Sequence, residues 1–158
     1  MTQKKSPFGF EKPESSPGFL LWQTLTIWQR LIKRQLEEYR LNHTQFVILA
    51  IAYWFSTKDN IAKQTDIITL SKLEKMTVSK SLKSLASLNL IQRSENQSDS
   101  RFKNIILTDE GEKLIKLLIP MVEKVDNDFF NTLTKNENDI IKDCFKKLSH
   151  FQSIDNSF

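Results

Sequence analysis

Residues 63–107 read KQTDIITLSKLEKMTVSKSLKSLASLNLIQRSENQSDSRFKNIIL, and the order of elements in this segment predicts the architecture. Apolar spacing indicates a short helix over Thr65–Ser71 and a second one over about Glu74–Leu88. Leu90–Asn96 and Arg101–Leu107 have the composition of strands, and the polar run between them is typical of a turn. Two adjoining helices followed by a β-hairpin are the order of a winged helix-turn-helix.

The second helix of this segment has one apolar and one polar side. Val78, Leu82 and Leu85 fall within a narrow arc with Ala86 beside them, so this side should face the core. Hydroxyls and cations suit a DNA major groove, where they hydrogen-bond base edges and neutralise phosphates. The opposite side carries such residues, namely Thr77, Lys80, Lys83, Ser84 and Ser87.

The predicted hairpin adds further cations. Asn89 precedes it at a position where the backbone commonly turns left-handed and Gly or Asn is preferred. Asp99, Arg101 and Lys103 lie at its tip and on its return strand, and Arg93 lies on its first strand. An arginine at an exposed tip can enter a narrow A·T-rich minor groove, where negative potential is concentrated, and a nearby carboxylate would orient it.

Composition agrees with a mainly helical protein that meets an anionic partner. Three glycines and four prolines occur, and five of these seven lie in the first eighteen residues. The net charge of +4 is uneven, because residues 1–60 and 61–103 carry +3 and +4 whereas residues 104–158 carry −3. The basic part would meet DNA first, although a modest excess of Lys and Arg is also common on solvated surfaces.

Long helices are predicted before this segment. Ser16 and Pro17 open a helix that reaches Tyr39, and its apolar surface is wider than one neighbouring helix would cover. Asn42 with Gln45 resembles a capping box and opens a helix that is apolar all round, as expected of a central, buried helix.

Two more helices are predicted after the hairpin. Thr108 caps a long amphipathic helix, and Thr134 with Glu137 opens the last one. The apolar face of the last helix carries Ile141, Cys144, Phe145 and Leu148, and we expect Cys144 to be a buried core thiol.

Several classes of protein are disfavoured. The longest apolar run, Phe46–Phe55, is too short to cross a bilayer and the N-terminus has no apolar signal segment, so we expect a cytoplasmic protein without a membrane partner. Cys144, His43 and His150 have no metal-ligand spacing, and no phosphate loop or nucleophile elbow occurs. We therefore expect no enzyme, no metal and no cofactor, with His43 facing solvent and His150 near a helix C-terminus.

Specific residues resemble those of a known family. The runs Asp66–Leu70, Lys75–Lys80 and Leu88–Arg93 resemble the helix-turn-helix of MarR-family transcriptional regulators. Asp99-Ser100-Arg101 followed by Leu107–Gly111 resembles that family's D-x-R and L-T-x-x-G wing signature. The resemblance covers about residues 18–150, and the wing signature is its most specific part.

The resemblance implies a homodimer that places two recognition helices in successive major grooves of an operator duplex, with repression as the usual mode of regulation. Residues 1–15 would be a flexible arm and residues 16–158 a single domain. In that domain, residues 16–40 and 109–152 would form dimerisation helices around a winged helix-turn-helix lobe at residues 41–108. The expected fold class is thus mainly α with a small β-hairpin wing.

Roles follow from the resemblance by position. The major groove would be met by Thr77, Ser79, Lys80 and Lys83. Arg101 would enter the minor groove and Asp99 would orient it. Asn89 stands where the family usually has glycine, and Asn tolerates the same left-handed geometry.

Many relatives bind small aromatic or phenolic effectors between the dimerisation helices and the DNA-binding lobe. Aromatic side chains are candidates to line such a pocket, foremost Phe19, Trp22 and Trp54, with Trp28, Tyr39, Phe46 and Phe55 as further members. The alternative interpretation is plain packing in the core and dimer interface, which is the commoner role of aromatic residues at helical spacing.

One alternative function is left open by the sequence. A winged helix can bind another protein in place of DNA, because fold alone does not determine function. The cations grouped on the recognition helix and hairpin favour DNA, and a steep fall of binding with salt would distinguish the two functions.

Overall fold

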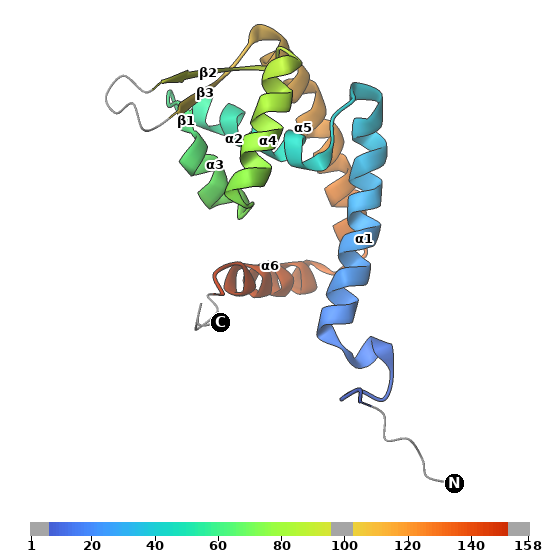
Figure 1. The fold of residues 1–158 in the computed structure, drawn as a ribbon. Helices are drawn as coiled ribbons and strands as arrows, with labels where there is room; N and C mark the ends of the chain where they lie inside the picture. Colours follow the sequence, from blue (N-terminus) through green and yellow to red (C-terminus); the bar gives the residue numbers. More distant parts are fainter. Residues whose placement is uncertain (1–6, 96–102, 152–158) are drawn as a thin grey trace. The chain divides into compact units, whose positions relative to one another are not determined.

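The computed structural model describes residues 7–95 and 103–151 (Figure 1). Within these residues there are six α-helices, two short 3-10 helices and three β-strands. The chain divides into two compact units, Met1–Val122 and Glu123–Phe158. The mainly helical fold class with a small wing is confirmed.

The first long helix, α1, spans Pro17–Leu36 and follows the 3-10 turn η1, Pro13–Ser15. The hydroxyl of Ser16 accepts a hydrogen bond from the Phe19 amide, and proline occupies the first helical position, as predicted. The 3-10 helix η2, Glu37–Tyr39, continues α1 and stops where Arg40 turns left-handed, with φ 56°. Only the C-terminal part of α1 is buried, through Ile32 and Leu36, so its N-terminal half presents an apolar face to solvent.

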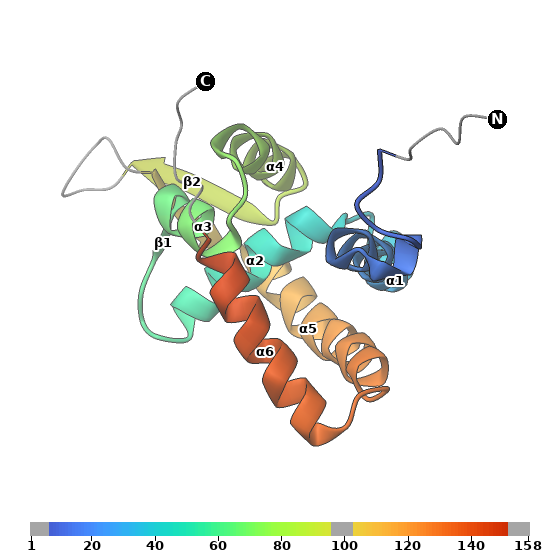
Figure 2. The same cartoon turned by 90° about the horizontal axis from the view of Figure 1, so that it is seen from below.

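Helix α2, His43–Ser56, is the centre of the first unit (Figure 2). The predicted capping box is present, because Asn42 and Gln45 exchange side-chain to backbone hydrogen bonds of 2.8 and 2.9 Å. α2 contacts α1, α3, α4 and strands β1 and β3, which explains why apolar residues surround it on all sides. His43 is half-buried with its ring against the edge of Trp28, so the expectation that it faces solvent was wrong.

The helix-turn-helix consists of α3, Gln64–Ser71, and α4, Lys75–Ser87. Lys72 takes left-handed geometry between them, with φ 57°, and gives the sharp turn without glycine. Asn89 has φ 58° after α4, as predicted, and the Leu90 amide then donates to the Leu85 carbonyl at 3.0 Å.

The sheet has three antiparallel strands in the order β1-β3-β2. β2, Ile91–Glu95, pairs along its length with β3, Lys103–Leu107, and the two form the predicted hairpin beside α4 (Figure 1). β1, Ala62–Lys63, pairs with β3 and was not predicted, because two residues are too few for a periodic signal. The residues between β2 and β3 lie outside the described ranges.

Helix α5, Asp109–Phe130, begins directly after the hairpin and runs through Pro120. Thr108 holds this junction, since its hydroxyl donates to the Asn89 carbonyl at 2.7 Å and accepts from the Gly111 amide at 3.0 Å. Gly111 packs on the Leu90 backbone so closely that a Cβ would stand 1.9 Å from the Leu90 carbonyl oxygen. The threonine and glycine therefore join the wing to α5.

The second unit contains α6, Lys135–Ser149. Thr134 and Glu137 form the predicted capping box. Cys144 is exposed, so the expectation of a buried core thiol was wrong. The apolar face was assigned correctly by spacing, but none of its residues is buried, because a helical stripe is buried only where another surface covers it.

Candidate nucleic-acid interface

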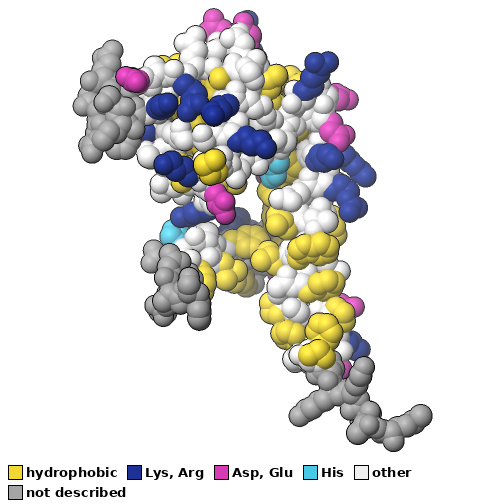
Figure 3. Space-filling model, in the orientation of Figure 1, with side chains coloured by type: hydrophobic (Ala, Val, Ile, Leu, Met, Phe, Trp, Pro, Cys, Tyr) yellow, Lys and Arg dark blue, Asp and Glu magenta, His cyan; other side chains and the backbone are white. Residues whose placement is uncertain are grey.

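Helix α4 presents the polar side that its sequence predicts. Val78, Leu82 and Leu85 are fully buried against the core of the first unit. The opposite side exposes Thr77 and Lys80, and Lys83 is exposed one turn from Lys80. Figure 3 shows Lys and Arg side chains gathered over the face that presents α3 and α4. A rigid helix thus carries hydroxyls and cations at its exposed surface.

In the described part of the chain, no ion pair engages the cations of this surface. Ion pairs among residues 7–95 and 103–151 lie on α1 with η2, on α5 and on α6, as in Lys33 with Glu37. None of these pairs includes a cation of α4, β2 or β3. Glu74 precedes α4 and makes no side-chain cap bond. The charge of Lys80 and Lys83 is therefore available to an anionic partner.

Ser84 has a structural partner that the sequence did not reveal. It is half-buried, and its hydroxyl accepts a hydrogen bond of 2.9 Å from Nε2 of Gln45. Gln45 is itself buried and caps α2, so this bond joins the start of α2 to α4. Because a hydroxyl can accept and donate at once, the role of Ser84 toward DNA stays a prediction.

Two hollows border α4. One, of about 360 Å³, lies between the N-terminus of α2 and α4 and is lined mainly by polar residues, among them Thr44, Thr77, Lys80 and Ser81. The other, of about 320 Å³, lies between α3, α4 and the sheet and includes Arg93. Grooves on both sides of a protruding helix match the two phosphate backbones that border a major groove.

The second hollow brings together predicted and unpredicted residues. Ser79, Arg93 and Lys103, all predicted, line it together with Lys75 and residues of α3. Lys75 lies four residues before Ser79 and therefore on the same helix side, a spacing from which it could have been found. The sequence did not predict that residues of α3 line this hollow, because their position depends on how α3 packs beside the sheet.

Asp99 and Arg101, the residues predicted at the wing tip, fall outside the described residues, and their roles remain predictions. Lys103 is the first residue of β3 and is exposed.

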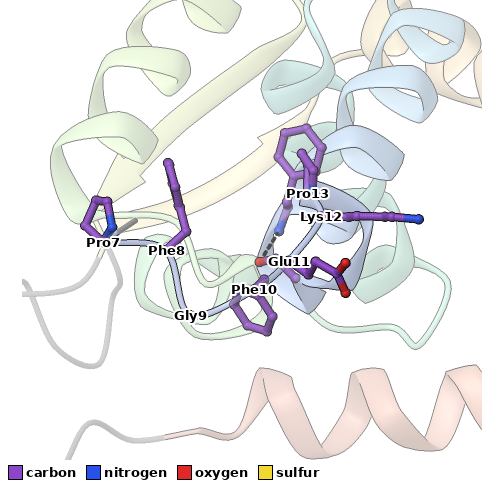
Figure 4. A pocket seen from close by; sticks show the side chains of 9 residues that line it. Pro7, Phe8, Gly9, Phe10, Glu11, Lys12 and Pro13 are labelled. Atoms are coloured by element: carbon purple, nitrogen blue, oxygen red, sulfur yellow. Dashed lines mark hydrogen bonds between the residues drawn. The ribbon is translucent and has the colours of Figure 1, made fainter. Parts of the chain in front are cut away.

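Two of the three foremost aromatic candidates for an effector pocket, Phe19 and Trp54, line different hollows. Phe19 lines an open hollow of about 610 Å³ with residues 7–13 and Ser16, before and at the start of α1 (Figure 4). Trp22 stacks on Phe19 with ring centroids 6.3 Å apart and is exposed. Trp54 lines a separate hollow at the end of α2, beside Phe55 and Leu70. Phe46 is buried in the core, as the packing interpretation expects.

Within residues 7–95 and 103–151, no group of three or more His, Cys, Asp or Glu residues could hold a metal ion. No helix within the same ranges has the length and apolar character needed to cross a membrane.

The order α3, α4, β2 and β3, with cations exposed on α4 and at the start of β3, defines a winged helix-turn-helix protein. A family model described as "ArnR1-like, winged-helix domain" matches residues 37–125. A relative from Bacillus subtilis (strain 168), the HTH-type transcriptional regulator YdcH, is 36% identical over 129 residues, which are 82% of this chain and 88% of YdcH.

Solved structures agree with this likeness. The MepR–DNA complex of S. aureus has a TM-score of 0.78 at 25% identity and covers 87% of this chain and 99% of MepR. Apo MarR from E. coli has a TM-score of 0.65 at 17% identity and covers 84% of this chain and 96% of MarR. The chain therefore belongs to the ArnR1-like winged-helix family and is a helix-turn-helix transcriptional regulator, with a fold similar to that of MarR.

Proposed function

We propose that this regulator is a homodimeric repressor that inserts α4 of each subunit into the major groove of a two-fold symmetric operator. The observation that carries the proposal is the exposed side of α4, where Thr77, Lys80 and Lys83 stand on a helix anchored by buried Val78, Leu82 and Leu85. Side chains on a rigid helix can contact base edges and phosphates without prior ordering.

Exposed apolar side chains support the dimer. Phe19, Leu21, Trp22 and Leu25 are between 37% and 63% exposed on the N-terminal half of α1 (Figure 3). Neighbouring apolar residues extend this face, and a contiguous apolar surface of this kind marks a protein interface. We propose that residues 16–40 and 109–152 supply the dimer contacts and that residues 41–108 form the DNA-binding lobe.

The experiment is selection of bound sequences from a random duplex pool, followed by titration of the selected duplex at rising salt. We expect two-fold related half-sites about 34 Å apart. The logarithm of the binding constant should fall with the logarithm of salt concentration at a slope of about −0.9 per phosphate contacted. A protein-binding winged helix would select no sequence and show no such slope.

Variants connect this binding to α4. Lys80→Ala should weaken binding to the selected duplex while the melting temperature stays that of the wild type, because Lys80 is exposed and makes no ion pair within the described ranges. Lys113→Ala removes an exposed lysine from α5 and serves as the matched control. Equal affinities for the two variants would contradict the role of α4.

A further inference from the structure

The hollow between α3, α4 and the sheet has the composition of an anion site. Three cations from three different elements line it, namely Lys75 of α4, Arg93 of β2 and Lys103 of β3. Gln64, Thr65 and Ser79, whose side chains carry an amide and two hydroxyls, also line it, and no carboxylate is among its described lining residues. A hollow that gathers cations and hydrogen-bond donors without a counter-charge is suited to an oxyanion.

The guanidinium of Arg93 has one buried nitrogen without a hydrogen-bond partner among the described residues. Its Nη2 donates to Oε1 of Gln64 at 3.3 Å, which connects the strand to the start of α3. Its Nε is the one side-chain nitrogen or oxygen among residues 7–95 and 103–151 that is buried and has no hydrogen-bond partner. Buried polar groups are nearly always paired in native structures, so the unpaired Nε marks the guanidinium of Arg93, which lines the hollow, as a group with unused donor capacity.

We propose that this hollow binds a tetrahedral oxyanion, and that a backbone phosphate of the bound duplex supplies it. The location favours the duplex over a free anion, because Lys75 and Ser79 belong to α4 itself. When α4 lies in a major groove, a phosphate at the groove edge comes beside this side of the helix. Gln64 then acts as a positioning residue that holds the Arg93 guanidinium toward the phosphate.

This inference rests on the proposed DNA binding and assigns one phosphate to a defined place. A phosphate here would be shared by three cations instead of being paired with each one separately. The contact would be independent of base sequence, so it would fix the register of α4 and contribute equally to operator and random duplex.

The first arm of the test measures the salt dependence of duplex binding for Lys75→Gln, Lys103→Gln and the double variant, with Lys113→Gln as the control. We expect the single variants to weaken binding to operator and random duplex by the same factor. The double variant should make the slope shallower by no more than about 0.9, because both lysines serve the same phosphate and Arg93 remains beside it. A loss of about twice that slope would overturn a single shared site.

The second arm observes the Nε–H resonance of Arg93 by NMR in the wild-type protein. We expect this resonance to shift when duplex is added. Inorganic phosphate, added at the same ionic strength and up to the phosphate concentration of the duplex, should leave the resonance unchanged. A shift with inorganic phosphate, together with unchanged DNA binding by the lysine variants, would assign the hollow to a free anion and overturn the duplex assignment.

Failure of this inference differs from failure of the proposed function. If the wild type binds duplex with a steep salt slope but Lys75→Gln and Lys103→Gln equal the Lys113→Gln control, the hollow proposal is wrong and DNA binding stands. If the wild type itself has no salt-dependent duplex binding, the proposed function fails as well.

Discussion

Replacement of Gly111 by alanine tests the junction between the wing and α5. A Cβ at residue 111 would lie 1.9 Å from the carbonyl oxygen of Leu90 and 2.9 Å from its carbonyl carbon. Because ordinary carbon–oxygen contacts begin at about 3.3 Å, the backbones of α5 and of Leu90 must move apart by more than about 1 Å to admit the Cβ. The Leu90 carbonyl also accepts from the Thr108 amide at 3.1 Å, so this bond is strained by the same movement.

The expected change in the free energy of unfolding is the balance of two effects. Alanine in place of a helical glycine ordinarily stabilises by about 0.5–1 kcal/mol, through backbone entropy. Overpacking of a closed contact costs about 1–3 kcal/mol, and an overlap with backbone atoms belongs at the upper end. We therefore expect Gly111→Ala to lower the free energy of unfolding by about 2 kcal/mol, which lowers the melting temperature by about 4–8 °C for a chain of this size.

The assay is thermal and urea denaturation at one fixed protein concentration, because the stability of a dimer depends on concentration. Gly18→Ala is the matched control, since a Cβ there would meet only the Ser16 hydroxyl, at 3.9 Å, and should leave stability equal or slightly higher. If Gly111→Ala were as stable as the wild type, the close packing of α5 on Leu90 would be refuted as the reason for glycine at this position.

Three further predictions concern other contacts. Ser84→Ala removes the acceptor of the buried α2 glutamine and should lower the free energy of unfolding, measured by urea denaturation, by about 1 kcal/mol. Ser87→Ala should be neutral, because its hydroxyl donates to the Ser84 carbonyl of the same helix, and equal effects of the two variants would contradict the bridge between α2 and α4. Leu25→Asp should convert dimers to monomers in sedimentation velocity, because it places a charge on the exposed apolar face of α1, and persistent dimers would rule that face out as the interface. Backbone and side-chain hydrogen bonds from Thr134 hold the pKa of Glu137 below its usual value, so its contribution to α6 is present above the usual glutamate pKa and is lost as the pH falls through the lowered one. A carboxyl titration by NMR with a midpoint at or above the usual glutamate pKa would disprove this.

Features set by neighbours along the chain were predictable. The buried side of α4 follows from the spacing of Val78, Leu82 and Leu85, and the capping boxes of α2 and α6 from residue pairs three apart. The left-handed Asn89 was predicted from its place between a helix and a strand. Each of these depends on interactions within one or two helical turns, so the local sequence contains the information.

Features that need distant segments were missed or misjudged. Strand β1 exists because Ala62 pairs with Ile105, 43 residues away in the chain. The spacing of the last helix indicated which side is apolar but not that Cys144 is exposed. The foremost aromatic candidates were grouped by type, and the structure places Trp54 in a different hollow from Phe19.

The amino-acid pattern alone thus accounts for the helix-turn-helix, its polar recognition side and the hairpin, since periodicity and capping act over a few residues. Assembly of the fold was needed to bring Nη2 of Arg93 on β2 to 3.3 Å from Oε1 of Gln64 at the start of α3, and to the same hollow as Lys75 of α4. The physical reason is that burial and side-chain pairing across elements arise from packing in three dimensions, which spacing along one element does not encode.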